Sequence, residues 1–388
     1  MTQPSSRLLP AAASAAFLDP ARGLARLPRH PGRARPAEFL ARYEALALFY
    51  DCFWHADGTR ILLVGPPPLN LMPALRGARV VARPSGTPLR PRFFASAAVM
   101  LTELSGAPVG TEAVAVRLPD GQEFELPVQP SSAAALAGRR VLFTVSKDND
   151  LAWIREWAHY HARIQGADAV VFFDNGSTRY APGEVAETLL SVPGIAEAAV
   201  LSWPHLYGAP DPAVRINPFY THFLQIGAMG VALRRYAARA AGLLNCDVDE
   251  LVATPEGGTV FSRLARSSHG LLVMRGQYVE PLPADGAPEP RTHRHFPFRH
   301  RDPARRLSRP RKWALDPTRP WVADLRVHPY MHWIEGRPWF SKTQSPEVFY
   351  WHFRGISTNW KDRRADLAGL DRSAFEPDGL WQATAARL

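Results

Sequence analysis

The sequence predicts an α/β protein in which a parallel sheet with helices on its faces follows a smaller β-rich part. Between 140 and 251, short apolar runs alternate with amphipathic segments, which is the strand–helix rhythm of a parallel sheet. The preceding stretch contains short strand-like runs and a turn-favouring Asp-Gly dipeptide. We therefore expect a poorly ordered arm at 1–36, a β-rich domain at 37–136, an α/β domain at 137–370 and a C-terminal tail at 371–388.

The β-rich part is expected to contain strands at 60–65 and 79–82. The runs 113–118 and 123–128 flank the Asp-Gly dipeptide and are expected to pair as a hairpin. No motif in this part indicates its role, so binding of a substrate, dimerisation and scaffolding all remain open.

The α/β part is expected to begin with a buried strand at 140–146. One of the polar residues at 148–150 can cap the next helix, which shows one apolar face and ends at Gly166. The later elements follow in order: a strand at 169–173, a helix at 184–192, a strand at 195–201, a long helix at 218–241, and strands at 243–246 and 271–274.

The net charge of the chain bears on the kind of partner that it binds. The formal charge of +10 favours an anionic partner, and a nucleic acid, a nucleoside diphosphate, an acidic glycan and a membrane surface all fit it. The basic runs at 22–42 and 300–312 are equally compatible with solvated loops. Peripheral contact with a membrane and the oligomeric state stay open.

The cysteines and the apolar runs bear on the compartment. Cys52 and Cys246 form neither a disulfide framework nor a zinc-binding spacing. No run approaches the ~20 apolar residues of a membrane span, and the N-terminus lacks a clean signal peptide. We expect a cytoplasmic protein without a transmembrane segment.

Three carboxylates stand close together where the strand at 243–246 ends. Asp247, Asp249 and Glu250 repel one another unless a cation or a basic side chain offsets them. In an extended segment, Asp247 and Asp249 would point the same way. Oxygen ligands of this kind suit Mg²⁺ or Mn²⁺. An exposed turn without a ligand is the simpler alternative.

Two further positions are candidates for the same site. Asp174 follows the strand at 169–173, and ligands collect at the carboxyl ends of parallel strands. Asn175 and Ser177 would form the tight turn after it. His352 lies in an apolar strand that leads into a polar loop, where it would complete a metal site or serve as a core histidine.

Several ordered motifs resemble family-92-like and family-2-like glycosyltransferases over roughly 140–365. The matching segments are 147–161, 166–168 and 173–178, Gln225 in the long helix, Asp247-Val248-Asp249-Glu250-Leu251, and His352 in a late His-Phe-Arg. The resemblance implies a GT-A fold, which is a Rossmann-like nucleotide-sugar-binding domain, a nucleotide-sugar donor, a divalent metal and inversion at the anomeric carbon.

The resemblance also implies roles for individual residues. Asp174 would contact the nucleoside, Asp247 and Asp249 would hold the metal on the diphosphate, and His352 would be a further ligand. The family's usual Lys-Asn-Glu is Lys147-Asp148-Asn149 here, and the segment after the acidic motif differs. The acceptor site and the catalytic base therefore do not carry over.

The resulting prediction is a hexosyltransferase that uses Mn²⁺ or Mg²⁺, a nucleoside diphosphate sugar, preferably a UDP-sugar, and a glycan acceptor. Glu280 is the candidate base, with Asp302 or Glu335 as replacements. The candidate donor-binding residues are Lys147, Asp148, Asp174, Asn175, Ser177, Gln225, Asp247, Arg311, Lys312, Arg354 and Lys361.

Two other classes of function compete with this prediction. A metal-dependent nucleotidyltransferase also presents carboxylates at strand ends, although it more often carries a Gly-rich basic loop, and none occurs at 146–151. A non-catalytic glycan- or nucleic-acid-binding protein would use the basic runs. Three carboxylates at a strand end would oppose a polyanion, so no nucleic acid is expected as a partner.

Overall fold

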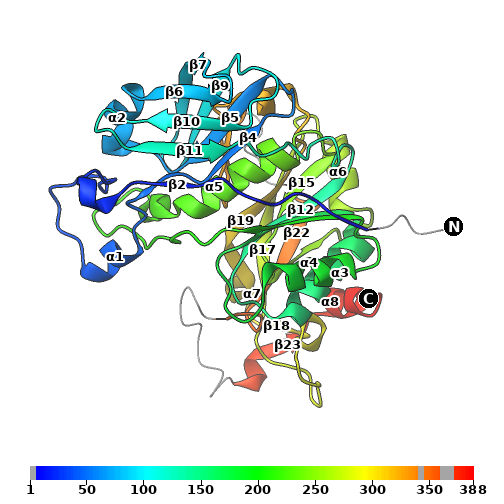
Figure 1. Ribbon diagram of the computed structural model, residues 1–388. Coiled ribbons are helices and arrows are strands. Elements are labelled where there is room, and N and C mark those ends of the chain that lie inside the picture. Colours follow the sequence, from blue (N-terminus) through cyan, green and yellow to red (C-terminus); the bar gives the residue numbers. More distant parts are fainter. Residues whose placement is uncertain (1–5, 340–344, 359–370) are drawn as a thin grey trace.

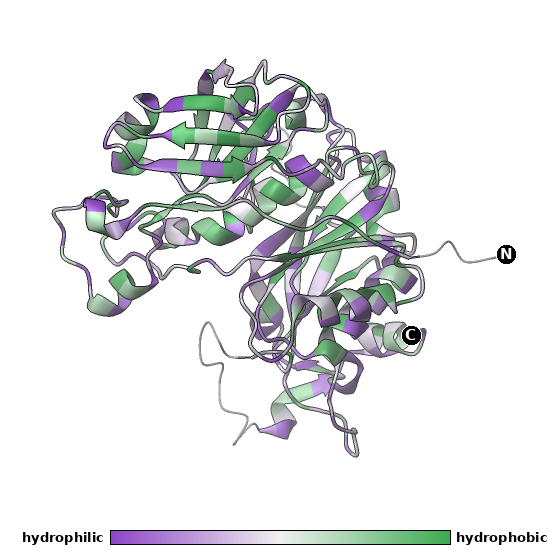
Figure 2. Ribbon diagram, in the orientation of Figure 1, coloured by the Kyte–Doolittle hydropathy of each residue, from purple (hydrophilic) through white to green (hydrophobic). Residues whose placement is uncertain are grey.

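The computed structural model describes residues 6–339, 345–358 and 371–388. These residues form a mixed α/β structure with one nine-stranded sheet, two four-stranded sheets and eight α-helices (Figure 1). Hydrophobic residues run along the strands of both the large sheet and the small sheets (Figure 2). The expected α/β class is confirmed at this level, whereas the large sheet is mixed rather than parallel.

Four parallel strands, flanked at the sheet edge by the short parallel strand β1 (Arg7–Leu8), make up one half of the large sheet. They are β12 (Arg140–Ser146), β13 (Ala169–Asp174), β14 (Glu197–Ser202) and β15 (Gly242–Asn245), in the order β14-β13-β12-β15. All four lie where the sequence predicts strands. Their residues are almost entirely buried, as expected for parallel strands covered on both faces.

The helix α3 (Leu151–Gln165) follows β12 as predicted. The Asp150 side chain accepts a hydrogen bond from Ala152 N–H and so caps the helix, while Gly166 ends it at φ 72° in the left-handed region. The next helix, α4 (Pro182–Leu190), packs on α3 and on β14.

The other half of the sheet contains β19 (Leu307–Leu315), β17 (Leu271–Val279), β22 (Phe349–Phe353) and β16 (Glu250–Ala253). The strand β19 is antiparallel to both β15 and β17, and β22 is parallel to β17. Six strands, β12 to β15, β17 and β22, therefore end at the same edge of the sheet. We call this the carboxyl edge.

The connection from β15 to β16 forces this half of the sheet to curl. These two strands are four places apart in the sheet, which is about 19 Å at the usual strand spacing of about 4.8 Å. Only residues 246–249 connect them, and a hydrogen bond from Glu250 N–H to the Asp247 carbonyl (3.0 Å) makes this connection a tight turn. So short a link cannot cross a flat sheet, and the ends of β19, β17 and β22 that lie at the carboxyl edge are drawn around the turn.

The long helix predicted at 218–241 is instead broken into three pieces. A short 3₁₀ turn (Pro218–Thr221) precedes α5 (Phe223–Val231), which continues as a wider π-turn (Ala232–Tyr236). His222 at the first break has ψ 53°, outside the helical region. The wider turn buries Arg234 and Arg235 together.

The β-rich part contains two four-stranded sheets, of order β4-β5-β9-β8 and β11-β10-β6-β7. The predicted hairpin is present as β10 (Ala113–Arg117) paired with β11 (Glu123–Pro127), and the predicted strands at 60–65 and 79–82 correspond to β5 (Arg60–Gly65) and β6 (Arg79–Arg83). The helix α5 contacts both β5 and β12, so it lies between the two parts (Figure 1).

The expected arm at 1–36 contributes regular structure in its described residues. The strand β1 (Arg7–Leu8) pairs with β14, and β2 (Ala16–Phe17) pairs with β3 (Ala47–Phe49). Arg26 is buried and donates hydrogen bonds to three backbone carbonyls. Backbone pairing and carbonyl capping order this segment, although it lacks hydrophobic periodicity.

The expected C-terminal tail is also packed. Its strand β23 (Phe375–Pro377) pairs with β18 (Phe298–His300), and Trp381 of α8 (Gly379–Ala385) is fully buried. The remaining elements are α1 (Ala37–Arg42), β4 (Asp51–Trp54), α2 (Met72–Arg76), β7 (Pro88–Leu89), β8 (Pro91–Ala95), β9 (Met100–Ser105), α6 (Val260–Arg266), α7 (Pro303–Arg306), β20 (His328–Pro329) and β21 (Ile334–Glu335). Among the described residues, no helix has the length and apolar character to span a membrane.

Candidate functional site

The carboxyl edge brings together several residues that the sequence singled out. Asp174 ends β13, Asp247 follows β15, Glu280 follows β17 and Arg354 follows β22. Residues up to 180 positions apart therefore lie along one edge of one sheet. Ligands of parallel sheets collect at such an edge.

Asp247 to Glu250 form a tight turn, which we call the acidic turn. Asp247 N–H donates to Glu250 Oε2 at 2.9 Å, in addition to the backbone bond that closes the turn. The extended geometry expected here is therefore wrong, because the strand ends at Asn245, before the acidic residues. Asp247 instead contacts Lys312, whereas Asp249 contacts His352.

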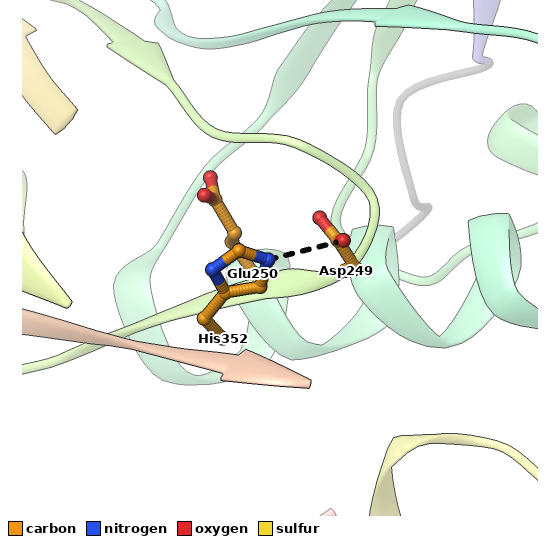
Figure 3. A group of neighbouring side chains, drawn as sticks. All are labelled: Asp249, Glu250 and His352. Carbon is orange, nitrogen blue, oxygen red and sulfur yellow. Dashed lines mark ion pairs between the residues drawn. The ribbon is translucent and has the colours of Figure 1, made fainter. Parts of the chain in front are cut away.

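Asp249, Glu250 and His352 form a group whose potential ligand atoms all lie within 4.8 Å of one another (Figure 3). The register of β16 and β22 pairs Glu250 directly with His352. Asp249 Oδ2 lies 3.3 Å from His352 Nε2, the contact drawn as a dashed line in Figure 3. The Ser308 hydroxyl lies 3.0 Å from His352 Nδ1 and fixes the ring so that Nε2 faces the acidic turn.

The ligand atoms that these three side chains offer fit a divalent cation. Two carboxylates and one imidazole nitrogen suit Mn²⁺, and the carboxylates alone suit Mg²⁺ with water filling the remaining positions. The predicted ligands Asp249 and His352 belong to this group, and Asp247 lies beside it. Glu250 is a further candidate ligand that was not assigned from the sequence, although three carboxylates in four residues were the available signal.

Lys312 supplies the positive charge beneath the acidic turn. Its Nζ lies 2.7 Å from Asp247 Oδ2 and 3.0 Å from Glu250 Oε2, and its side chain is 2 % exposed. Burial raises the pKa of the Glu250 carboxyl, while the Lys312 ammonium opposes this rise. Although burial lowers the pKa of Lys312, the two carboxylates hold it well above its usual value, so the lysine is charged.

The Asp174 carboxylate accepts hydrogen bonds from the backbone N–H of Ser177, at 3.0 Å, and from its hydroxyl. Burial raises the pKa of Asp174, and the nearby charge of Lys147 opposes part of this rise. Asp148 joins this loop to the end of β12, since its N–H donates to Ser177 Oγ at 2.8 Å and its carboxylate accepts from Thr178 N–H at 2.7 Å. Asp148 and Ser177 therefore shape the loop around Asp174.

Two other predicted donor-binding residues have structural partners. Asn175 Nδ2 donates to the carbonyls of Trp203 and His205, which holds the segment after β14. Gln225 is buried in α5 and accepts a hydrogen bond from the Tyr207 hydroxyl at 2.8 Å. A donor contact of either residue stays a prediction.

Arg311 precedes Lys312 on β19, where successive side chains alternate between the two faces, and it is exposed. This places its side chain away from the acidic turn. Lys361 lies outside the described residues.

Glu280 is 2 % exposed, and its Oε2 accepts a hydrogen bond from Arg354 at 3.1 Å. Its Oε1 has no hydrogen-bond partner among the described residues. The Arg354 guanidinium also lies 4.4 Å from the centre of the Tyr278 ring, and that ring is 5.3 Å from the ring of His352. Glu280 is thus linked through its neighbours to the group of Asp249, Glu250 and His352.

The two alternative bases lie in other surroundings. Asp302 caps α7 by accepting a hydrogen bond from Ala304 N–H, and it is exposed. Glu335 pairs with His328 in the small hairpin of β20 and β21. Of the three carboxylates, Glu280 is the one that directly follows a strand at the carboxyl edge.

His293 and Glu156 also contribute to the site but were not identified from the sequence. His293 Nε2 lies 2.8 Å from the carbonyl of Val248, inside the acidic turn. Glu156 of α3 binds the residues on either side of His293. No local pattern reveals these contacts, because they join segments more than 40 residues apart.

No protein-family model matches the chain, and a comparison with curated proteins finds no significant match.

Proposed function

We propose that the protein is a metal-dependent inverting glycosyltransferase. It would move a hexosyl unit from a nucleoside diphosphate sugar, preferably a UDP-sugar, to a hydroxyl group of a glycan. The observation that carries the proposal is the group of Asp249, Glu250 and His352 at the carboxyl edge, with Asp174 on the same edge. The resemblance described above supports the same conclusion.

The spacing of the two acidic positions suits a nucleotide. The strands β13 and β15 are separated only by β12, which places their ends about 10 Å apart. Asp174 would accept hydrogen bonds from the nucleoside, and a metal ion held by Asp249, Glu250 and His352 would receive the diphosphate. The loop that holds Asp174 is fixed by Asp148 and Ser177, so little ordering is needed when the donor binds.

A bound Mn²⁺ or Mg²⁺ would neutralise the charge that develops on the leaving diphosphate. Asp249, Glu250 and His352 would hold it, and Lys312 would add a fixed positive charge beside it. Lys312 is buried and paired, so it keeps its charge and its position without reorganising during the reaction.

Glu280 would act as the base through its Oε1 atom, which is buried here and would become accessible as the acceptor binds. This oxygen would take the proton of the acceptor hydroxyl while the hydroxyl oxygen bonds to the anomeric carbon. The bond from that carbon to the diphosphate oxygen would break, and the nucleoside diphosphate would leave. A single displacement of this kind inverts the anomeric centre. The hydrogen bond from Arg354 to Oε2 would orient the carboxylate.

A panel of nucleoside diphosphate sugars, measured by calorimetry with and without Mn²⁺, tests the proposal directly. At least one donor should bind in a Mn²⁺-dependent way, and Asp249→Ala should abolish both donor hydrolysis and transfer. Glu125→Ala, at an exposed position of β11, is the control and should change neither. Full activity of Asp249→Ala in Mn²⁺ would rule out this site.

A further inference from the structure

We infer that His293 is a positioning residue that fixes the direction of Asp249 by holding the peptide bond before it. The functional consequence, a fixed direction for the candidate metal ligand Asp249, rests on the proposed function. The contact itself is a property of the fold, since it joins the 3₁₀ turn at His293–His295 to the loop between β15 and β16.

The hydrogen bond from His293 to the turn has a defined direction. His293 Nε2 lies 2.8 Å from the Val248 carbonyl, which can only accept, so Nε2 carries the proton. The ring is fully buried, and burial lowers the pKa of His293. The neutral imidazole therefore donates its single N–H to the acidic turn.

The peptide bond after Asp249 is held as well. Phe353 N–H donates to the Asp249 carbonyl at 2.8 Å. Peptide groups are planar, so fixing the Val248 and Asp249 carbonyls fixes both peptide planes that flank the Asp249 Cα atom. The direction of the Asp249 side chain, toward His352, follows from these two bonds.

The two supports of Asp249 contact each other. The ring of Phe353 packs edge-on against the ring of His293, with centroids 4.9 Å apart. Phe353 directly follows His352 on β22, so the same strand supplies a candidate ligand and a backbone clamp. His293 thus buttresses both the acidic turn and the strand that faces it.

Glu156 of α3 holds His293 in place from behind. Its carboxylate accepts hydrogen bonds from the Thr292 hydroxyl at 2.5 Å, from Arg294 N–H at 2.9 Å and from Arg294 Nε at 3.0 Å. These donors lie on both sides of His293. A long helix packed on the sheet therefore anchors the histidine, and through it the acidic turn.

The test compares two replacements of His293 that differ mainly in whether they keep a hydrogen-bond donor. His293→Gln retains an N–H at about the distance of Nε2 from the backbone, whereas His293→Leu has a similar bulk and no donor. We expect amide hydrogen exchange at 247–250 to accelerate in the Leu variant, and its Mn²⁺ affinity to fall about 10- to 100-fold. The Gln variant should restore both properties to within about threefold of the wild type.

His328→Leu is the control for loss of a buried histidine, since His328 is 3 % exposed and belongs to the β20–β21 hairpin. It should leave both readouts unchanged. If His293→Leu does not fold, Glu156→Gln removes the charged anchor without a change of volume and should shift both readouts in the same direction.

Wild-type exchange and Mn²⁺ affinity in His293→Leu would overturn the inference, and so would equal losses in the Gln and Leu variants. If the wild-type protein binds no Mn²⁺, the proposed function fails, but hydrogen exchange at 247–250 still decides the role of His293.

Discussion

The Lys312 ammonium lies between two carboxylates of the acidic turn, 2.7 Å from Asp247 Oδ2 and 3.0 Å from Glu250 Oε2. It offsets the repulsion within the turn and allows Glu250 to be buried. The same ammonium is also a like charge next to any divalent cation that binds the neighbouring group. Lys312 thus stabilises the turn and, at the same time, would weaken the binding of a cation beside it.

Removal of this charge should strengthen metal binding. Lys312→Met is expected to raise the Mn²⁺ affinity on the order of tenfold, because like charges a few ångströms apart repel by about 1–2 kcal/mol even when strongly screened. Calorimetric titration with Mn²⁺ measures the change. Arg311→Met, at the exposed neighbouring position, is the control and should have little effect. An unchanged or lower affinity in Lys312→Met would contradict this prediction.

Replacement of Glu280 should impair the chemical step without impairing the binding of donor or metal. Glu280→Gln should lower the transfer rate by at least about a hundredfold, the contribution expected from a positioned base. Donor and Mn²⁺ affinities should stay within a few-fold, since the amide keeps the volume of the side chain. Glu335→Gln, in the β20–β21 hairpin, should transfer at the wild-type rate. Normal turnover of Glu280→Gln would eliminate it as the base.

Arg235 and Asp51 form an ion pair in which both side chains are 0 % exposed, and it joins the β-rich part to the π-turn after α5. Arg235→Met should lower the free energy of unfolding by about 3–5 kcal/mol, because it leaves a buried carboxylate without its partner. Arg235→Met combined with Asp51→Leu should recover much of this loss. Urea unfolding measures both.

The pair of Arg7 and Glu197 is the matched control for this ion pair. Arg7 is 58 % exposed, and Arg7→Met should cost at most about 1 kcal/mol. Equal losses at the two pairs would show that burial does not set the strength of the Asp51–Arg235 interaction.

Stability should fall in mild acid because of buried histidines. Burial lowers the pKa of His328 to about 4, below its usual value of 6.5. Between these two values the unfolded chain binds a proton that the native protein does not. The contribution of His328 is therefore fully present above about pH 6.5 and is lost as the pH falls toward 4.

His328→Gln tests this pH dependence. It should reduce the slope of stability against pH by up to about 1.4 kcal/mol per pH unit between pH 6 and 4, which corresponds to one proton. Urea unfolding across this range gives the slope. An unaltered slope would show that His328 titrates alike in the native and unfolded states.

Local patterns in the sequence correctly predicted the parallel strands and the helix α3 near the site, but not β16 or β19, which carry Glu250 and Lys312. Val170 to Phe173 form an apolar run followed by Asp174, and Asp150 and Gly166 are the cap and stop of α3. Apolar periodicity, capping and turn chemistry act over a few residues, so the chain itself displays them. The prediction of one continuous helix at 218–241 was wrong, because the break at His222 does not interrupt the apolar pattern of the sequence.

The sequence by itself determined that carboxylates end the strands of an α/β sheet, with Asp247, Asp249 and His352 as candidate ligands. Only the tertiary structure decided which side chains lie next to them: Asp249 and Glu250 lie beside His352, and Asp247 lies beside Lys312. The curl of the sheet around the acidic turn creates these pairs. It depends on strand order and register, which join residues that no local pattern connects.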